Sequence, residues 1–445
     1  MFRCNSLASV QIWKGIRNWY YFDAVSKGEI MGYIEELGKK AVQAKGKIAS
    51  ASTDEKNAVL VKIAEVLRNH TEKILQENDK DIASARENGI TETMVDRLRL
   101  TEERIEGIAD ACIQLVNLED PVGEILEGSV RPNGMRITKV RVPLGVAGII
   151  YESRPNVTVD AAALCIKSGN AAILRGGKEA IHSNMVLMEL MQQALKECGF
   201  AGETVQLVED TSREVAAEMM RANDYIDVLI PRGGAGLIQA IVKNATVPVI
   251  ETGTGNCHLY VDETAELSMA VSIADNGKTQ RPSVCNALET CLVHQSVAKE
   301  FLLMLAEAFE AHQVEIRGCD RTREILGAGV MLATEEDYAT EFLDYIMSVK
   351  VVDSIEEAIE HIRKYSTGHS ECIVTSNYSH AEQFQKEVDS ACVYVNCSTR
   401  FTDGGEFGLG AEIGISTQKL HVRGPMGLRE LTTQKYLING NGQIR

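Results

Sequence analysis

The stretch Gly145-Val-Ala-Gly-Ile-Ile150 is the first of five short apolar runs in the middle of this 445-residue chain. The others are Ala171-Ala-Ile-Leu174, Thr204-Val-Gln-Leu-Val208, Ile226-Asp-Val-Leu-Ile230 and Val247-Pro-Val-Ile250. Segments with a helical spacing of apolar residues separate them, which is typical of repeated strand-helix units. Runs so rich in Val, Ile, Leu and Ala indicate parallel strands that are buried on both faces. The sequence therefore predicts a doubly wound α/β domain whose ligand crevice lies at the carboxyl ends of these strands.

The same alternation begins again after residue 255 and predicts a second α/β domain. Its apolar runs are 287–293, 349–352, 371–374 and 392–395, with helices at about 297–309 and up to residue 362. Amphipathic helices are expected after the capping candidates Thr53-Asp54 and Thr101. The segments 134–142 and 431–438 resemble strands with an exposed face, and exposed strand edges favour a homo-oligomer. We expect a first domain of 31–122 and 144–253, a second of 254–430, and oligomerisation strands in 123–143 and 431–445.

Composition excludes several classes of protein. The chain has 46 Lys and Arg against 63 Asp and Glu, a net charge of −17, which argues against a general nucleic-acid binder. No apolar run approaches the roughly 20 residues that span a membrane. The eleven cysteines include no Cys-x-x-Cys pair. We therefore expect a reducing compartment, the cytoplasm, with neither a disulfide framework nor a metal site.

Residues 1–30 differ from the rest of the chain. They contain both tryptophans, without helical or strand periodicity, and Lys27-Gly28-Glu29-Ile30 reads like a translated ribosome-binding site in front of Met31. We expect this extension to be non-native, with Met31 as the true start.

Cys285 is the main candidate for chemistry. It lies in Asn276-Gly-Lys-Thr-Gln-Arg-Pro-Ser-Val-Cys285-Asn, between a helical segment and an apolar strand and 34 positions after Glu251. A cysteine at such a chain reversal has backbone N–H groups nearby that can bind a developing oxyanion. Cysteines inside apolar runs, such as Cys165, Cys291 and Cys392, are expected to be small buried residues instead.

Six ordered motifs resemble those of the gamma-glutamyl phosphate reductases, a family within the aldehyde dehydrogenase superfamily. They are Tyr151-Glu-Ser-Arg-Pro-Asn156, Lys167-Ser-Gly-Asn-Ala-Ala-Ile-Leu-Arg-Gly-Gly-Lys178, Pro231-Arg-Gly-Gly234, Glu251-Thr-Gly-Thr-Gly-Asn-Cys-His258, Lys278-Thr-Gln-Arg-Pro-Ser-Val-Cys285-Asn and a segment from Val352 to Ile373. The resemblance covers nearly the whole chain from Met31. It implies an aldehyde dehydrogenase-like α/β fold and the NADPH-dependent reduction of L-glutamyl 5-phosphate to the 5-semialdehyde in proline biosynthesis.

The resemblance also implies roles for individual residues. Cys285 attacks the acyl phosphate and becomes a thioester, while its own backbone N–H and the amide of Asn156 bind the oxyanion. Asparagine after proline is also a common turn residue. Glu251 occupies the position that activates water in hydrolytic relatives, so its role here is either proton transfer or structural.

Alignment with the family indicates which residues bind the cofactor. Arg175 and Lys178 follow a predicted strand where a nucleotide ribose lies, and the cation at Lys178 favours a 2′-phosphate and hence NADPH. The turn Arg232-Gly233-Gly234 is shorter than the superfamily's usual phosphate turn. Glu341 is either a ligand of the nicotinamide ribose or a solvated residue on a helix.

Three cations are candidates for binding the anionic substrate. Arg154, Lys278 and Arg281 flank the motifs of Asn156 and Cys285, and their alternative roles are packing or surface pairing. Besides the small-molecule substrate, a glutamate 5-kinase is a candidate partner. A coenzyme A-acylating or hydrolytic aldehyde dehydrogenase, and a catalytically silent scaffold, are the alternative functions.

Overall fold

The computed structural model describes residues 31–445, so the expectation about residues 1–30 lies outside it. The first unit is built on a parallel sheet with the strand order β5-β4-β3-β6. Its strands are β3 (Val146–Tyr151), β4 (Ala171–Arg175), β5 (Val205–Leu207) and β6 (Val228–Arg232). Ala147 and Ile149 of β3 belong to the core on one face, whereas Val146 and Ile150 belong to the core on the other. Burial on both faces explains why the strand lacks polar alternation.

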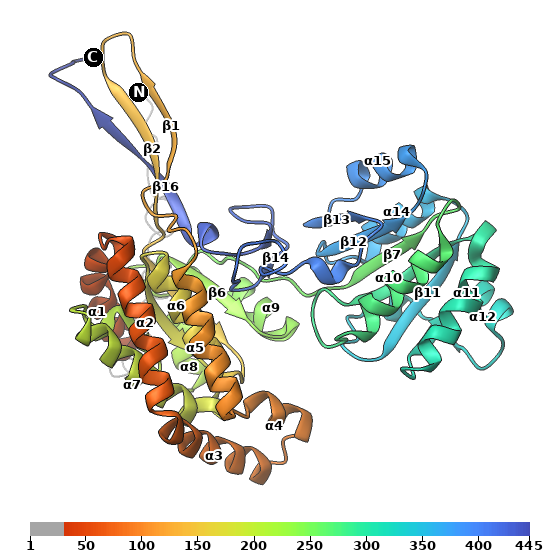
Figure 1. The fold of residues 1–445 in the computed structure, drawn as a ribbon, viewed down its shortest axis with the longest axis horizontal. Coiled ribbons are helices and arrows are strands. Elements are labelled where there is room, and N and C mark those ends of the chain that lie inside the picture. The colour runs from red at the N-terminus through yellow and green to blue at the C-terminus, as the bar shows by residue number, and fades with distance from the viewer. Residues whose placement is uncertain (1–30) are drawn as a thin grey trace, which may run out of the picture.

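Helices cover both faces of this sheet (Figure 1). One face carries α2 (Thr53–Asn69), α5 (Glu102–Val116), α6 (Pro155–Lys167) and α7 (Ile181–Glu197), flanked by α3 (Thr71–Glu87) and α4 (Glu92–Leu98). The other carries α1 (Met31–Ala49), α8 (Arg213–Met219) and α9 (Ala235–Asn244). Thr101 caps α5 as expected, but Ser52, rather than Thr53, caps α2 in a capping box with Glu55.

The second unit holds a seven-stranded parallel sheet with the order β10-β9-β11-β8-β7-β12-β13. Its strands are β7 (Cys257–Val261), β8 (Leu288–His294), β9 (Glu315–Gly318), β10 (Met331–Leu332), β11 (Ile346–Val352), β12 (Ser370–Val374) and β13 (Cys392–Val395). Its helices are α10 (Leu267–Thr279), α11 (Gln295–Glu310), α12 (Asp320–Leu326), α13 (Glu335–Tyr338), α14 (Ile355–Tyr365) and α15 (Tyr378–Glu387). Because α10 and α11 pack on one face and α14 and α15 on the other, both predicted doubly wound domains are confirmed.

An antiparallel three-stranded arm projects from the first unit (Figure 1). It consists of β1 (Ile125–Val130), β2 (Arg136–Pro143) and β16 (Thr432–Asn439), with β2 in the centre. A short pair, β14 (Ile415–Ser416) and β15 (Gly424–Pro425), lies in the segment that leads back to the arm. The strands predicted at 134–142 and 431–438 are thus confirmed, but β2 pairs on both sides and is not the edge strand that was predicted.

Two details of the predicted sheets were wrong. The run 247–250 forms a single bridge between Val249 and Leu229, because Pro248 has no N–H to donate to a ladder. The strands β7, β9 and β10 were not expected from the sequence.

The strand order places a crevice between β3 and β6. The chain moves outward from β3 through β4 to β5 and then returns to β6 on the other side of β3. Such a reversal leaves room for a ligand at the carboxyl ends of the two strands. Tyr151 and Arg232, the last residues of β3 and β6, are paired there. Asn156 and Gly234 therefore follow strands that end at the same place.

None of the helices described for residues 31–445 combines the length and apolar character that crossing a bilayer requires. The ten cysteines in this part of the chain are free thiols.

Candidate active site

Cys285 lies in the turn between α10 and β8, as the sequence predicted. The turn packs tightly on the backbone that leads into β7. A Cβ atom on Gly255 would come within 1.4 Å of the Cys285 carbonyl oxygen, and the Cys257 thiol donates to that oxygen at 3.2 Å. Only glycine therefore fits at position 255, and the close contact fixes the position of the cysteine backbone.

The electrostatic surroundings of the Cys285 thiol are mixed. Burial raises the pKa of this thiol to about 11, and the Arg232 guanidinium opposes that rise. The carboxylates of Glu341 and Glu412 raise the pKa of the thiol further. The charge of Arg232 thus favours the thiolate form of Cys285.

Asn156 lies in the first turn of α6, directly after Pro155. Its Nδ2 donates to Asp160 Oδ2 at 2.9 Å, one helical turn further on. A carboxylate cannot donate to an amide oxygen, so this bond fixes which side of the amide carries the N–H groups. The second N–H remains available for an oxyanion. Burial raises the pKa of Asp160 to about 6, while the bond from Asn156 and the charge of Arg232 lower it.

The turn Arg232-Gly233-Gly234 differs from the predicted cofactor-phosphate turn. The Gly234 N–H donates to Glu152 Oε2 at 3.0 Å, and a Cβ on Gly233 would lie 2.7 Å from the Glu152 carboxyl carbon. A glutamate carboxylate therefore already occupies the donor that was expected to bind phosphate. The charge of Arg232 instead acts on the catalytic groups, because it lowers the pKa of the Cys285 thiol and of the Asp160 carboxyl.

Arg175 and Lys178 differ in their freedom to bind a ligand. Arg175 ends β4, and its Nη2 donates to the carbonyls of Thr211 and Ser212 at 2.8 and 2.9 Å. It therefore fastens the loop in front of α8. Lys178 begins the 3-10 helix η1 (Lys178–Ala180) and is exposed. No hydrogen bond or ion pair within residues 31–445 engages its ammonium group.

Glu341 and Glu251 both contact the backbone near Gly255 or lead into it. Glu341 lies in the extended segment after α13, and not on a helix as predicted, and its Oε1 accepts the Gly255 N–H at 2.7 Å. Burial raises the pKa of Glu341. The backbone N–H of Glu251 donates to Gln418 Oε1 at 3.0 Å, which ties this segment to the part of the chain that follows β14.

Lys278 is not free to bind a substrate. Its side chain is completely buried, and its Nζ contacts Glu289 Oε2 at 2.6 Å and the Leu288 carbonyl at 2.9 Å. The predicted role of Lys278 in substrate binding is therefore replaced by a buried ion pair between α10 and β8. Arg154 and Arg281, in contrast, line a cavity of about 450 Å³ together with Asn156 and Ser283.

Other residues of the site had not been expected from the sequence. They are Asp160, Glu152 and Glu412, and Arg97 and Arg99 in the wall of the same cavity. The i, i+4 spacing of Asn156 and Asp160 on a predicted helix was a signal for their bond. Sequence spacing offered no such signal for the arginines, because more than 50 residues separate Arg99 from Arg154.

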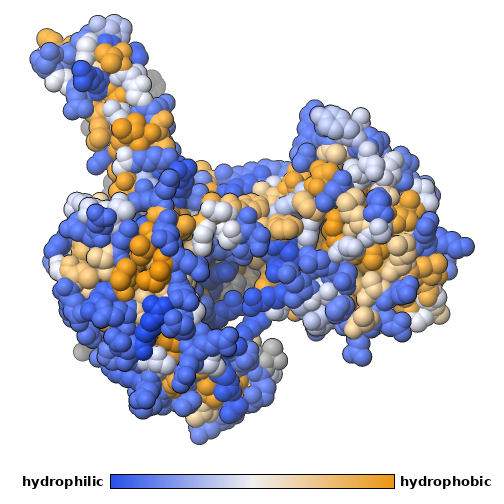
Figure 2. All heavy atoms as spheres, viewed as in Figure 1, coloured by the Kyte–Doolittle hydropathy of each residue, from blue (hydrophilic) through white to orange (hydrophobic). Residues whose placement is uncertain are grey.

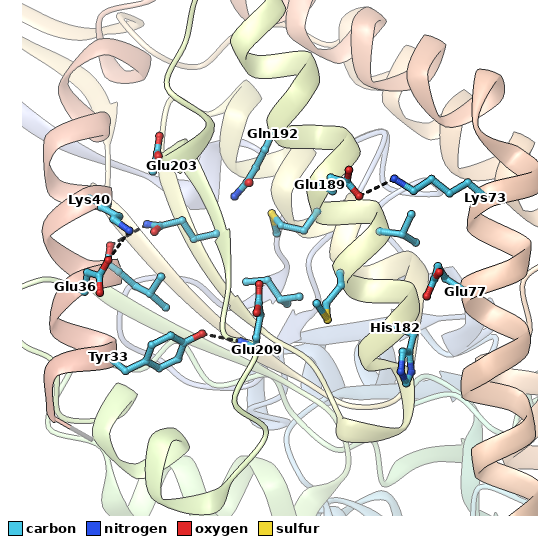
Figure 3. A pocket seen from close by; sticks show the side chains of 16 residues that line it. Tyr33, Glu36, Lys40, Lys73, Glu77, His182, Glu189, Gln192, Glu203 and Glu209 are labelled. Atoms are coloured by element: carbon cyan, nitrogen blue, oxygen red, sulfur yellow. Dashed lines mark hydrogen bonds and ion pairs between the residues drawn. The ribbon is translucent and has the colours of Figure 1, made fainter. Parts of the chain in front are cut away.

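A larger cavity, of about 670 Å³, lies between α1, α3 and α7 above the edge strand β5 (Figure 3). Five glutamates and two lysines line it, and Lys73 pairs with Glu189 at 2.7 Å. Its acidic lining does not suit a phosphate group, and Cys285 is not among its residues.

The chain is similar to known proteins along nearly all of the described residues. The sequence profile of the aldehyde dehydrogenase family matches residues 31–328 and 336–435. Gamma-glutamyl phosphate reductase from Clostridium perfringens strain 13 is 60% identical over 408 residues, which cover 92% of this chain and 98% of the relative. The enzyme of the same name from Carboxydothermus hydrogenoformans is 58% identical over 415 residues, covering 93% and 100%.

Solved structures support the same family. The crystal structure of gamma-glutamyl phosphate reductase from Thermotoga maritima superposes with a TM-score of 0.91 at 52% identity, covering 93% of this chain and 99% of that one. An acetylating aldehyde dehydrogenase from Geobacillus thermoglucosidasius, at 16% identity and a TM-score of 0.67, shares the fold. The chain therefore belongs to the aldehyde dehydrogenase family and, within it, to the gamma-glutamyl phosphate reductases.

Proposed function

We propose that this chain reduces L-glutamyl 5-phosphate to L-glutamate 5-semialdehyde with NADPH and releases phosphate, the second step of proline biosynthesis from glutamate. One observation carries the proposal. The turn that holds Cys285 contributes Arg281 and Ser283 to the cavity that also contains the Asn156 amide, in a chain 60% identical to a gamma-glutamyl phosphate reductase.

The residues of this chain divide the chemistry between them. The Cys285 sulfur attacks the acyl carbon, the C–O bond to phosphate breaks, and a thioester remains on the enzyme. Arg232 stabilises the thiolate that this step needs, since it lowers the pKa of the thiol. Asn156 and the Cys285 N–H bind the negative oxygen. Glu251, in the segment that runs to Gly255, is our candidate for taking up the thiol proton.

The residues present fit a nicotinamide cofactor in the first unit. Lys178 is exposed and unpaired within the described chain, directly after two glycines at the carboxyl end of β4. A Cβ on Gly176 would come within 2.2 Å of Asn184 Nδ2, so the backbone here passes close to α7. Lys178 would hold a 2′-phosphate, Arg175 would support the loop beside it, and Glu341 would bind the nicotinamide ribose. When bound, the cofactor supplies the hydride that reduces the thioester.

The reverse reaction tests this function. Purified protein is given pyrroline-5-carboxylate, NADP and phosphate, and the formation of NADPH is followed for the wild type, Cys285→Ala and Cys198→Ala. Activity that requires phosphate and disappears only in Cys285→Ala is the expected result. Equal activity without phosphate would instead indicate a hydrolytic enzyme, activity that appears only when coenzyme A replaces phosphate would indicate a coenzyme A-acylating one, and activity in Cys285→Ala would reject the thioester.

We propose different roles for the three parts of the chain. Residues 31–122 and 144–253 would bind the cofactor, residues 254–430 would supply the thiol, and the arm would join copies of the chain in a homo-oligomer. A glutamate 5-kinase, which produces the acyl phosphate, is the proposed functional partner.

A further inference from the structure

The residues that line the cavity around Asn156 come from two parts of the chain, which form two walls. One wall is formed by the start of α6, with Arg154 and Asn156, and by Arg281 and Ser283 of the nucleophile loop. The other wall is formed by the end of α4 and the first turns of α5, with Arg97 and Arg99. The volume of about 450 Å³ lies within the range of small-molecule sites, roughly 300–1,000 Å³.

The charge of this cavity is opposite to the charge of the chain. Five arginines but only two aspartates line it, whereas the chain as a whole carries −17. Both aspartates are engaged, because Asp96 binds Arg104 at 3.2 Å and Asp160 accepts the bond from Asn156. Within residues 31–445, no carboxylate pairs with Arg97, Arg99, Arg154 or Arg281.

The unpaired arginines repel one another. Burial lowers the pKa of Arg154, and the charges of Arg232, Arg97 and Arg281 lower it further. Like charges gathered without counter-ions are unfavourable until an anion binds, and guanidinium groups bind carboxylates and phosphates in a bidentate manner.

The two walls match the two ends of a glutamyl phosphate. The acyl carbon must lie between Cys285 and Asn156, so the phosphate on it lies beside Arg154 and Arg281. The α-carboxylate lies four carbon–carbon bonds further along, and the methylene groups between can pack on Leu100 and Ile108, which also line the cavity.

We infer that Arg97 and Arg99 form the binding site for the substrate's α-carboxylate, in the same cavity as the arginines that receive its phosphate. This inference rests on the proposed function. It assigns selectivity for an amino-acid substrate to the last turn of α4 and the residue that follows it, which contribute no group to the chemistry itself.

Steady-state kinetics of the reverse reaction test the assignment, because the semialdehyde and inorganic phosphate are separate substrates there. Arg97→Gln and Arg99→Gln should each raise the KM for the semialdehyde by about 10- to 100-fold and leave the KM for phosphate within about twofold. Arg281→Gln should do the opposite. Arg97→Lys and Arg99→Lys, which keep the charge but lose the bidentate fork, should give smaller increases.

Arg86→Gln is the matched control, since it removes an exposed arginine of α3 that pairs with Glu92 outside the cavity. A wild-type KM for the semialdehyde in both glutamine variants, or an increase confined to the KM for phosphate, would overturn the assignment. If the glutamine variants do not fold, the lysine variants decide, and an unchanged KM in them overturns it as well. A wild-type enzyme that does not oxidise the semialdehyde would reject the proposed function itself, which is a different result.

Discussion

Asp160 combines a role in the active site with a cost to the fold. Its pKa is raised from 3.8 to about 6 by burial, so the folded state holds the proton more tightly than the unfolded chain. Between these two values only the unfolded state ionises, and stability falls as the pH rises through this window. Above pH 7 the loss is about 2–3 kcal/mol, at about 1.4 kcal/mol for each pKa unit.

Asp160→Asn should therefore be more stable than the wild type at pH 8, by up to about 2 kcal/mol, and no more stable at pH 4. Urea unfolding at both pH values measures the difference. The same variant should turn over more slowly at saturating substrate, because a neutral partner no longer fixes the Asn156 amide in one orientation. Equal stability of the two proteins at pH 8 would contradict the buried, ionised Asp160.

Lys178 is expected to select between the two nicotinamide cofactors. Lys178→Ala removes the exposed cation at the end of β4 and should raise the KM for NADPH about tenfold, while the KM for NADH changes little. Lys196→Ala, in the last turn of α7, is the control for the loss of one charge. Parallel increases for both cofactors would show that Lys178 does not contact the 2′-phosphate.

The sequence could identify the reacting residues but not the partners of every cation. Cys285 and Asn156 were found because each stands within a contiguous motif next to a predicted strand or helix. Lys278 stands in the same motif as Cys285, yet the direction of its side chain depends on Glu289, which β8 brings to it from the other side of the turn. A lysine with a buried partner and a free lysine look the same in a sequence.

At the scale of elements, a strand was predicted where its sequence contains an uninterrupted apolar run. β4 is apolar up to its last residue, and β8 keeps the apolar run Cys291-Leu-Val293 beside the buried Glu289 and Thr290, so both strands were recognised. β7 was missed because its five residues include Cys257 and His258, and the buried His258 needs Glu371 of the neighbouring β12 to satisfy it. Side-chain partners on another strand are invisible before the sheet order is known.

The ion pair of Lys278 and Glu289 joins α10 to β8 on both sides of the Cys285 turn. Both side chains are completely buried, so Lys278→Met leaves a buried carboxylate without its partner and should destabilise the fold by about 3 kcal/mol or more. The double variant Lys278→Met/Glu289→Leu should recover much of this loss, because two apolar side chains can replace a buried pair. Urea unfolding of the three proteins measures both effects. A Lys278→Met protein that is fully stable but has a raised KM would restore the role in substrate binding.

At the scale of the whole molecule, the arm of β1, β2 and β16 leaves apolar side chains exposed to solvent. Apolar residues run along it in Figure 2, and Ile125, Val130, Tyr436 and Ile438 are each more than half exposed. β1 and β16 are both edge strands with unpaired backbone groups, and exposed apolar edges of this kind favour association. These features, rather than any property of the active site, support the proposed homo-oligomer.

The variant Leu437→Asp/Ile438→Asp tests this assembly. Neighbouring residues of a strand point to opposite faces, so the pair places a charge on each face of β16 without changing its backbone. We expect the wild type to elute as an oligomer in size-exclusion chromatography with light scattering and the variant to elute at a smaller mass. The melting temperature of the wild type should rise with protein concentration, and that of the variant should not. Ile444→Asp is the matched control, since Ile444 is 95% exposed beyond the end of the strand and its replacement should leave the mass unchanged. A monomeric wild type, or a variant that keeps the wild-type mass, would show that the arm has another purpose.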